Sequence, residues 1–143
     1  ANYLKLENPA KSTLAQPSLI TDNKLNSKEQ STQRIIVVED DADAADVTVL
    51  LLKSLGIEAV KAQTAKQCQD LLKNERNWTK ILLDLHLPDA NGLDLASSIK
   101  QSHPDITLIL VSGATVTEQQ LRQAGIDKAI LKPINIEILK SLR

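Results

Sequence analysis

Apolar and polar positions alternate from position 34 onward in a pattern that predicts strands and helices in succession. Short runs of β-branched and aliphatic residues are separated by longer stretches in which apolar positions recur at helical spacing. This alternation is typical of βαβ units, which form a parallel sheet covered by helices on both faces. The predicted strands are 34–38, 58–62, 81–85, 107–111 and 129–132, and the predicted helices are 42–55, 64–74, 92–101, 116–124 and 134–142.

The first 33 residues differ from the rest of the chain. They are rich in Ser, Thr, Asn, Gln and Lys, contain Pro9 and Pro17, and show no sustained periodicity. We therefore interpret 1–33 as a polar linker or tail and 34–143 as one α/β domain. The expected fold is a (βα)5 unit, a doubly wound parallel five-stranded sheet, and a chain of 143 residues with 42% hydrophobic content is long enough to form its core.

Composition excludes several classes of function for this domain. The net charge is −1 and the basic residues are scattered, so we expect no nucleic-acid binding. No apolar stretch approaches the roughly 20 residues of a membrane span, so we expect no membrane contact by this domain. The single cysteine, Cys68, cannot form an internal disulfide, which fits a cytoplasmic location. Because the sequence contains no methionine, we expect it to be a piece of a longer protein, and a membrane-anchored parent is compatible with these features.

Polar side chains follow four of the predicted strands at the point where each strand ends. They are Glu39, Asp40 and Asp41 after the first strand, Asp84 in the third, Ser112 after the fourth, and Lys132 at the end of the fifth. Because the carboxyl ends of parallel strands meet at one edge of the sheet, we expect these groups to share a crevice. Carboxylates, a hydroxyl and an ammonium group suit a divalent cation and a phosphoryl group.

The acidic run after the first strand favours a cation site. Like charges a few ångströms apart raise one another's pKa, so a positive group should lie near Glu39 and Asp40. Together with Asp84 they offer hard oxygen ligands, and Mg²⁺ suits such a sparse set because it keeps several waters. The alternative is helix capping, in which acidic residues complement the dipole of the following helix. We assign capping to Asp41 and Asp43, and metal binding to Glu39 and Asp40.

Asp84 is the candidate nucleophile. An aspartate on a strand end beside a metal can attack phosphorus and form an acyl phosphate. The transferred group then needs neutralisation of its equatorial oxygens, which Lys132, Ser112 and the cation would provide. Taken singly, a lysine before a proline is commonly a turn residue and a serine after a strand commonly caps. The prediction of a phosphoryl-transfer site therefore rests on Asp84, Ser112 and Lys132 occurring together.

The order of these segments resembles the receiver domain of two-component response regulators. The resemblance covers 34–143 and is carried by four segments: 37–41, 82–89, 111–114 and 131–133. It implies the flavodoxin-like receiver fold and transfer of a phosphoryl group from a phosphohistidine onto Asp84 with Mg²⁺. It also implies that Asp40 and Asp84 bind the metal directly, that Glu39 binds it through water, and that the backbone carbonyl of His86 completes the set.

The same resemblance assigns the remaining site residues. Ser112 would follow the phosphate, Lys132 would pair with it, and the peptide bond before Pro133 would be cis. Ala129 departs from the family pattern, which commonly has Tyr or Phe there, so the usual hydroxyl-to-aromatic readout is not expected. His86 and Ala114 flank the acceptor where the family tunes hydrolysis, and for His86 a solvent-facing loop position is the alternative.

Two apolar stripes run along the predicted helix 42–55. The longer stripe, expected to face the sheet, consists of Ala44, Val47, Thr48, Leu51 and Leu55. The second consists of Ala45, Val49 and Leu52, and we interpret it as a surface that docks a helix of the histidine donor. The alternative is one wide buried face.

The function expected from this site is a phosphorylation-controlled switch module that passes signals between proteins. Its partner would be a histidine kinase or a histidine phosphotransfer domain, and it would not be an enzyme beyond its own phosphotransfer and autodephosphorylation. An aspartyl-phosphate-type small-molecule phosphatase is the alternative, but such an enzyme needs a second acid where His86 stands and a pocket for its substrate. A third reading, a degenerate interaction module, is opposed by the intact set of site residues. We expect the parent to be a hybrid sensor histidine kinase, or else a response regulator truncated before its effector domain.

Overall fold

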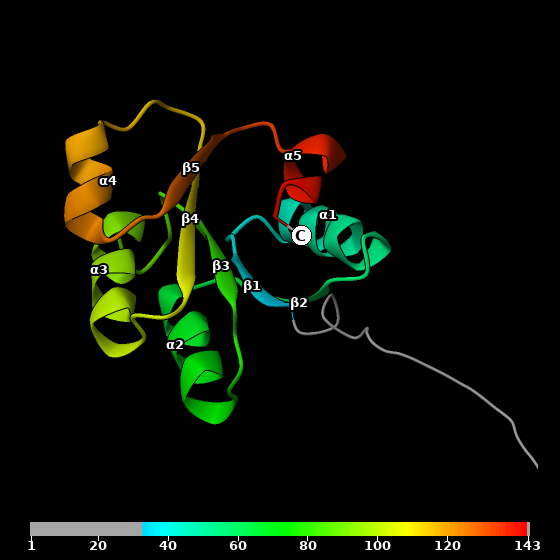
Figure 1. The fold of residues 1–143 in the computed structure, drawn as a ribbon, viewed down its shortest axis with the longest axis horizontal. Coiled ribbons are helices and arrows are strands. Elements are labelled where there is room, and N and C mark those ends of the chain that lie inside the picture. The colour runs from blue at the N-terminus through cyan, green and yellow to red at the C-terminus, as the bar shows by residue number, and fades with distance from the viewer. Residues whose placement is uncertain (1–32, 143) are drawn as a thin grey trace, which may run out of the picture. The chain divides into compact units, whose positions relative to one another are not determined.

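The computed structural model of the chain describes residues 33–142, where five strands alternate with five helices (Figure 1). The strands are β1 (Arg34–Val38), β2 (Glu58–Ala62), β3 (Lys80–Asp84), β4 (Thr107–Ser112) and β5 (Lys128–Leu131). The helices are α1 (Ala42–Ser54), α2 (Ala65–Asn74), α3 (Gly92–Ser102), α4 (Glu118–Ala124) and α5 (Ile136–Lys140). The predicted alternation is confirmed. The interpretation of 1–33 as a linker concerns residues that, except for Gln33, lie outside the described range.

All neighbouring strands of the sheet are parallel, in the order β2-β1-β3-β4-β5. The chain moves outward from β1 to β2 and then returns to place β3 on the other side of β1. A crevice opens at such a reversal, outside the carboxyl ends of the two central strands. Val38 of β1 pairs with Leu83 of β3. Glu39 and Asp84 are the next residues along the two chains, so they lie at the same level at the carboxyl edge of the sheet.

The core has two parts, one on each face of the sheet. Figure 1 shows α1 and α5 on one face, and α2, α3 and α4 on the other. Ile36 and Ile81 point toward α2 and α3, while Ile35 and Leu82 point toward α1 and α5. Because both faces are covered, the strand residues are buried on both sides, which explains their nearly continuous apolar runs.

Local capping sets where the helices begin. Asp41 caps α1 by accepting a hydrogen bond from the Ala44 N–H at 3.1 Å, as predicted. α4 begins two residues later than predicted because Thr117 and Gln120 form a capping box, and Gly125 ends it with a φ of 76°. α5 also begins later than predicted, after Asn135, whose side chain accepts from the Ile138 N–H at 2.9 Å.

The predicted docking stripe on α1 is wrong, because the structure buries it. Ala45 and Leu52 are 0% exposed, and Val49 is half-buried against the core cluster that contains Leu52. Thr48 joins this buried face, whereas Val47, which was expected to face the sheet, is 57% exposed. The helix is apolar on most of its surface, so spacing alone did not determine its rotation, and packing against β2 and α5 did.

Among residues 33–142, no helix combines the length and the apolar character needed to cross a lipid bilayer.

Candidate functional site

An acidic cluster lies at the reversal point of the sheet. Glu39 and Asp40 follow β1, and Asp84 is the last residue of β3. Each of the three offers a carboxylate oxygen, and these oxygens lie within 4.8 Å of one another. The parallel pairing of β1 and β3 produces this convergence, because it brings two strand ends from distant parts of the sequence to one edge. The predicted clustering is confirmed.

Lys132 provides a positive charge to this cluster. Its Nζ lies 3.1 Å from Glu39 Oε1 and 3.5 Å from Asp84 Oδ1. Glu39 is 9% and Asp84 8% exposed, whereas Asp40 is exposed to solvent. Two nearly buried carboxylates therefore share one ammonium group, and such a counter-charge offsets part of the cost of burying them together.

Burial and hydrogen bonding shift the pKa of two of these groups. Desolvation raises the pKa of Glu39, the Asp84 charge adds to this effect, and hydrogen bonds from the Asp41 N–H and from Lys132 oppose it. Desolvation alone would lower the pKa of Lys132, but the hydrogen bond to Glu39 and the charges of Asp84 and Glu39 together raise it. Lys132 therefore remains a cation at neutral pH.

Ser112 and Lys132 meet through the β4–β5 pairing. Ser112 pairs with Leu131, and the Lys132 N–H donates to the Ser112 carbonyl at 2.8 Å. Ser112 is 5% exposed, and its hydroxyl donates to the Ala114 carbonyl at 2.8 Å and accepts from the Ala114 N–H at 3.0 Å. The peptide bond between Lys132 and Pro133 is cis, which confirms that prediction.

The loop after Asp84 is a tight turn. The Leu87 N–H donates to the Ala90 carbonyl at 3.2 Å, and a backbone bridge joins His86 to Asn91. The side chain of His86 is exposed. Metal binding through its carbonyl stays a prediction, since it depends on where that oxygen lies when a cation is bound.

A groove runs from the acidic cluster along α1, with a volume of about 570 Å³. Its lining residues are Glu39, Asp43, Ala44, Val47, Thr48, Lys132, Pro133 and Ile134. The groove therefore joins site residues to apolar side chains of α1 and of the segment before α5. Sequence reasoning missed this surface because it placed Val47 in the core, and Ile134 carried no signal beyond its position after the motif proline.

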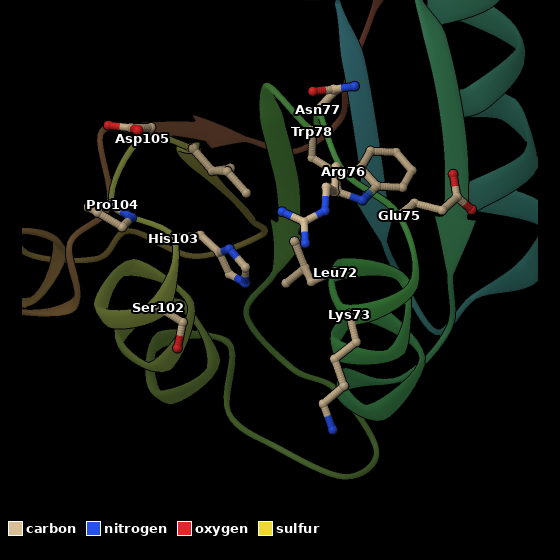
Figure 2. A pocket seen from close by; sticks show the side chains of 11 residues that line it. Leu72, Lys73, Glu75, Arg76, Asn77, Trp78, Ser102, His103, Pro104 and Asp105 are labelled. Atoms are coloured by element: carbon tan, nitrogen blue, oxygen red, sulfur yellow. The ribbon is translucent and has the colours of Figure 1, made fainter.

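A second hollow, of about 480 Å³, lies near the opposite end of the sheet (Figure 2). It is bounded by the C-terminal ends of α2 and α3 and by the segments that lead into β3 and β4. Lys73 in the last turn of α2 complements the negative end of that helix dipole. Basic and acidic side chains both line this hollow, and none of the predicted site residues is among them, so the acidic crevice remains the candidate site.

This fold and this site together define a receiver domain of two-component signalling. The profile of the response regulator receiver domain family matches residues 35–142, and the chain belongs to this family. Apart from Arg34, the first residue of β1, the match covers all five strands and all five helices, so the acids, the hydroxyl and the lysine lie inside it.

Curated relatives include response regulators and a sensor protein. The chain is 30% identical over 114 residues to the response regulator protein PilR of Pseudomonas aeruginosa, covering 78% of this chain and 25% of PilR. It is 32% identical over 112 residues to the sensor protein TorS of Escherichia coli, covering 76% of this chain and 12% of TorS. The chain thus spans a quarter or less of the length of either relative.

A solved structure agrees with the assignment. A CheY-like response regulator receiver domain protein from Methanospirillum hungatei superposes with a TM-score of 0.72 at 31% identity. The superposition covers 77% of this chain and 89% of that protein, so nearly the whole receiver unit is shared.

Proposed function

We propose that this receiver domain accepts a phosphoryl group on Asp84 from a phosphohistidine and that the phosphorylated form changes its interaction with a partner. The observation that supports this most directly is the position of the Asp84 carboxylate. It is nearly buried, lies 3.5 Å from the Lys132 ammonium, and shares its edge of the sheet with two further acids. A nucleophile, a counter-charge and cation ligands are the groups that phosphoryl transfer to an aspartate requires.

In the transfer, a carboxylate oxygen of Asp84 forms a bond to phosphorus while the P–N bond to the donor imidazole breaks. The imidazole nitrogen keeps the bonding electron pair and takes a proton from solvent. Charge collects on the equatorial phosphoryl oxygens during this step, and Lys132 is placed to stabilise one of them. Rotation of the Ser112 hydroxyl away from Ala114 would provide a hydrogen bond to another.

The acidic cluster fits Mg²⁺. Mg²⁺ prefers oxygen ligands, binds through one or two carboxylates and substrate oxygens, and keeps several waters, which suits Asp40 and Asp84 with Glu39 acting through water. When bound, the ion would neutralise charge on the phosphoryl group and orient it. Exposure of Asp40 leaves room for those waters.

The groove along α1 is the proposed docking surface for the histidine donor. One end is formed by Glu39 and Lys132, and the rest is lined by apolar side chains such as Val47 and Ile134. A donor helix that places apolar side chains against Val47 would bring a neighbouring histidine toward Asp84. The donor is a histidine kinase or a histidine phosphotransfer domain, the protein classes with which receiver domains of two-component systems interact.

The domain would act as a switch module in the cytoplasm and catalyse only its own phosphotransfer and dephosphorylation. Similarity to a segment of the sensor protein TorS supports a hybrid sensor histidine kinase as the parent. Similarity to PilR supports the alternative, a response regulator with an effector domain.

Acetyl phosphate provides a test of the acceptor chemistry without a protein donor. We expect intact-mass spectrometry to show one added phosphoryl group in the presence of Mg²⁺ and none when EDTA removes the metal. The Asp84→Asn variant should remain unlabelled under both conditions. Labelling that persists with EDTA would contradict the metal requirement, and steady turnover of p-nitrophenyl phosphate would favour the phosphatase alternative.

A further inference from the structure

Asp89, at the tip of the loop between β3 and α3, binds the start of a different helix. Its Oδ1 accepts a hydrogen bond from the Ala65 N–H at 2.9 Å, and its Oδ2 accepts one from the Lys66 N–H at 3.1 Å. These are the first two N–H groups of α2, and Thr64 Oγ1 accepts the next, from Gln67, at 3.0 Å. The free donors at this helix end are therefore satisfied partly by a loop 24 residues away.

The start of α2 also contacts the loop that follows β1. Gln67 Oε1 accepts from the Gln63 N–H at 2.8 Å, and Gln63 Nε2 reaches the Asp40 carbonyl at 3.5 Å. Nearby, the Glu39 N–H donates to the Ala62 carbonyl at 2.9 Å. The segment between β2 and α2 thus touches the loop with two of the site acids, and through Asp89 it holds the loop that follows the third.

The base of the Asp89 loop is fixed independently of its tip. The Gly92 N–H donates to the Leu85 carbonyl at 2.7 Å, which closes the turn against the end of β3. Because a carboxylate interacts favourably with a helix N-terminus, Asp89 is well suited to anchor the tip as well. Hydrogen bonds from the Ala65 and Lys66 N–H groups lower the pKa of Asp89, which keeps it ionised at neutral pH.

We propose that Asp89 is a positioning residue for the metal site. By binding the start of α2, it fixes the loop after Asp84 relative to the loop that contains Glu39 and Asp40. The inference rests on the proposed function, because it assumes that both loops contribute to one cation site. Partners that orient metal ligands typically change metal affinity 10- to 100-fold when removed, so Asp89 should affect binding without touching the ion.

Electron paramagnetic resonance of Mn²⁺ measures the affinity of the site without any phosphotransfer step. We expect Asp89→Ala to weaken Mn²⁺ binding about 10-fold, at the lower end of that range. Asp89→Asn should give an intermediate value, because the amide keeps one acceptor oxygen and loses the charge. The control is Thr64→Ala, which removes a cap from the same helix but leaves the Asp89 bonds in place, and it should bind Mn²⁺ like the wild type.

Hydrogen exchange of the metal-free protein provides the second readout. The Leu87 amide, which bonds the Ala90 carbonyl near the tip of the loop, should exchange faster in Asp89→Ala but not in Thr64→Ala, even if both variants lose thermal stability. Equal Mn²⁺ affinity in Asp89→Ala and wild type would overturn the inference, and so would equal weakening in Thr64→Ala. Failure of the wild type to bind Mn²⁺ would instead contradict the proposed metal site, and the exchange rates would still decide whether Asp89 holds the loop.

Discussion

At the scale of single residues, Lys132 joins the two buried carboxylates of the site. It lies 3.1 Å from Glu39 and 3.5 Å from Asp84, so its removal would leave both acids without their shared counter-charge. During transfer, the same ammonium group would face the charge that develops on the phosphoryl oxygens. Lys132 therefore neutralises buried charge in the folded domain and is placed to do the same for the proposed transfer.

Replacement of this lysine should slow phosphorylation strongly. Because removal of one preorganised donor typically costs a factor of about 100 or more, Lys132→Ala should be labelled by acetyl phosphate at least that much more slowly. Lys128→Ala, at the exposed start of β5, is the matched control and should be labelled at the wild-type rate. A labelling rate in Lys132→Ala within a few-fold of wild type would show that the ammonium group has no part in the transfer.

Asp127 shows how a charged residue stabilises the fold away from the site. Its Oδ2 accepts from the Leu108 N–H at 2.8 Å and lies 2.9 Å from Lys100 Nζ. Desolvation opposes ionisation of Asp127, but these two partners prevail and lower its pKa below the ordinary 3.8. Because the pKa is depressed in the folded state, the stabilisation is present above about pH 4 and is lost as pH falls through the folded pKa.

Chemical denaturation at several pH values tests this linkage. We expect Asp127→Asn to have a lower free energy of unfolding than wild type at pH 7. The difference in free energy between wild type and Asp127→Asn should shrink as pH falls below 4, because the wild-type carboxyl gradually becomes protonated and is then neutral like the amide. A difference that stays constant from pH 7 down to pH 3 would mean that the charge of Asp127 does not contribute.

At the scale of elements, the strands could be predicted more closely than the faces of the helices. Strand positions followed from short apolar runs that end on polar residues, and the structure moves their ends by no more than one residue. The rotation of α1 could not be predicted, because both of its stripes have helical spacing. Leu52 packs against residues that are distant in sequence, such as Ile109 and Leu139, and those contacts decide which stripe is buried.

The corrected face of α1 leads to a prediction about donor recognition. Val47→Asp should slow phosphotransfer from a histidine kinase, because it places a charge in the groove beside the site. Labelling by acetyl phosphate should be unchanged, since the small donor needs no docking surface. Leu50→Asp is the matched control, because Leu50 is 68% exposed and lies outside the groove. If Val47→Asp slowed phosphorylation by the histidine kinase and by acetyl phosphate to the same extent, the substitution would have damaged the phosphorylation site itself.

The start of α3 depends on a residue without a side chain. A Cβ at Gly92 would lie against the carbonyl oxygen of Asp84 and 2.9 Å from the Leu85 Cα, and both are backbone atoms. Gly92→Ala should therefore lower the free energy of unfolding by about 1–3 kcal/mol. Thermal or urea denaturation measures this loss. The control is Gly113→Ala, where a Cβ would meet nothing within 4 Å, so the loss of free energy of unfolding should be much smaller. Equal losses in the two variants would show that the clash at Gly92 is not the cause.

At the scale of the whole molecule, topology brings the site together. Glu39 and Lys132 are 93 positions apart in sequence, yet they form a hydrogen bond because β1 and β5 belong to one parallel sheet. Sequence alone could predict this meeting, since carboxyl ends of parallel strands share an edge. The sequence could not predict the hydrogen bonds between Asp89 and the start of α2. Aspartate is common in turns, and nothing in the sequence indicates which distant backbone groups it binds.

The single cysteine reports on the integrity of the whole core. Cys68 of α2 is fully buried, and burial raises the pKa of its thiol to about 12. Because the thiolate is the reactive form, iodoacetamide should label the native protein very slowly and the urea-unfolded protein rapidly. Rapid labelling under native conditions would show that α2 opens readily, contrary to the packing described above.

The most direct test of the account is the chemical identity of the acceptor. Protein phosphorylated by its donor or by acetyl phosphate can be reduced with borohydride, which converts an aspartyl phosphate to homoserine. Peptide sequencing by mass spectrometry then locates the changed residue. We predict homoserine at position 84 alone, and its presence at Asp40, or the survival of an unreduced phosphate on another residue type, would contradict the assignment.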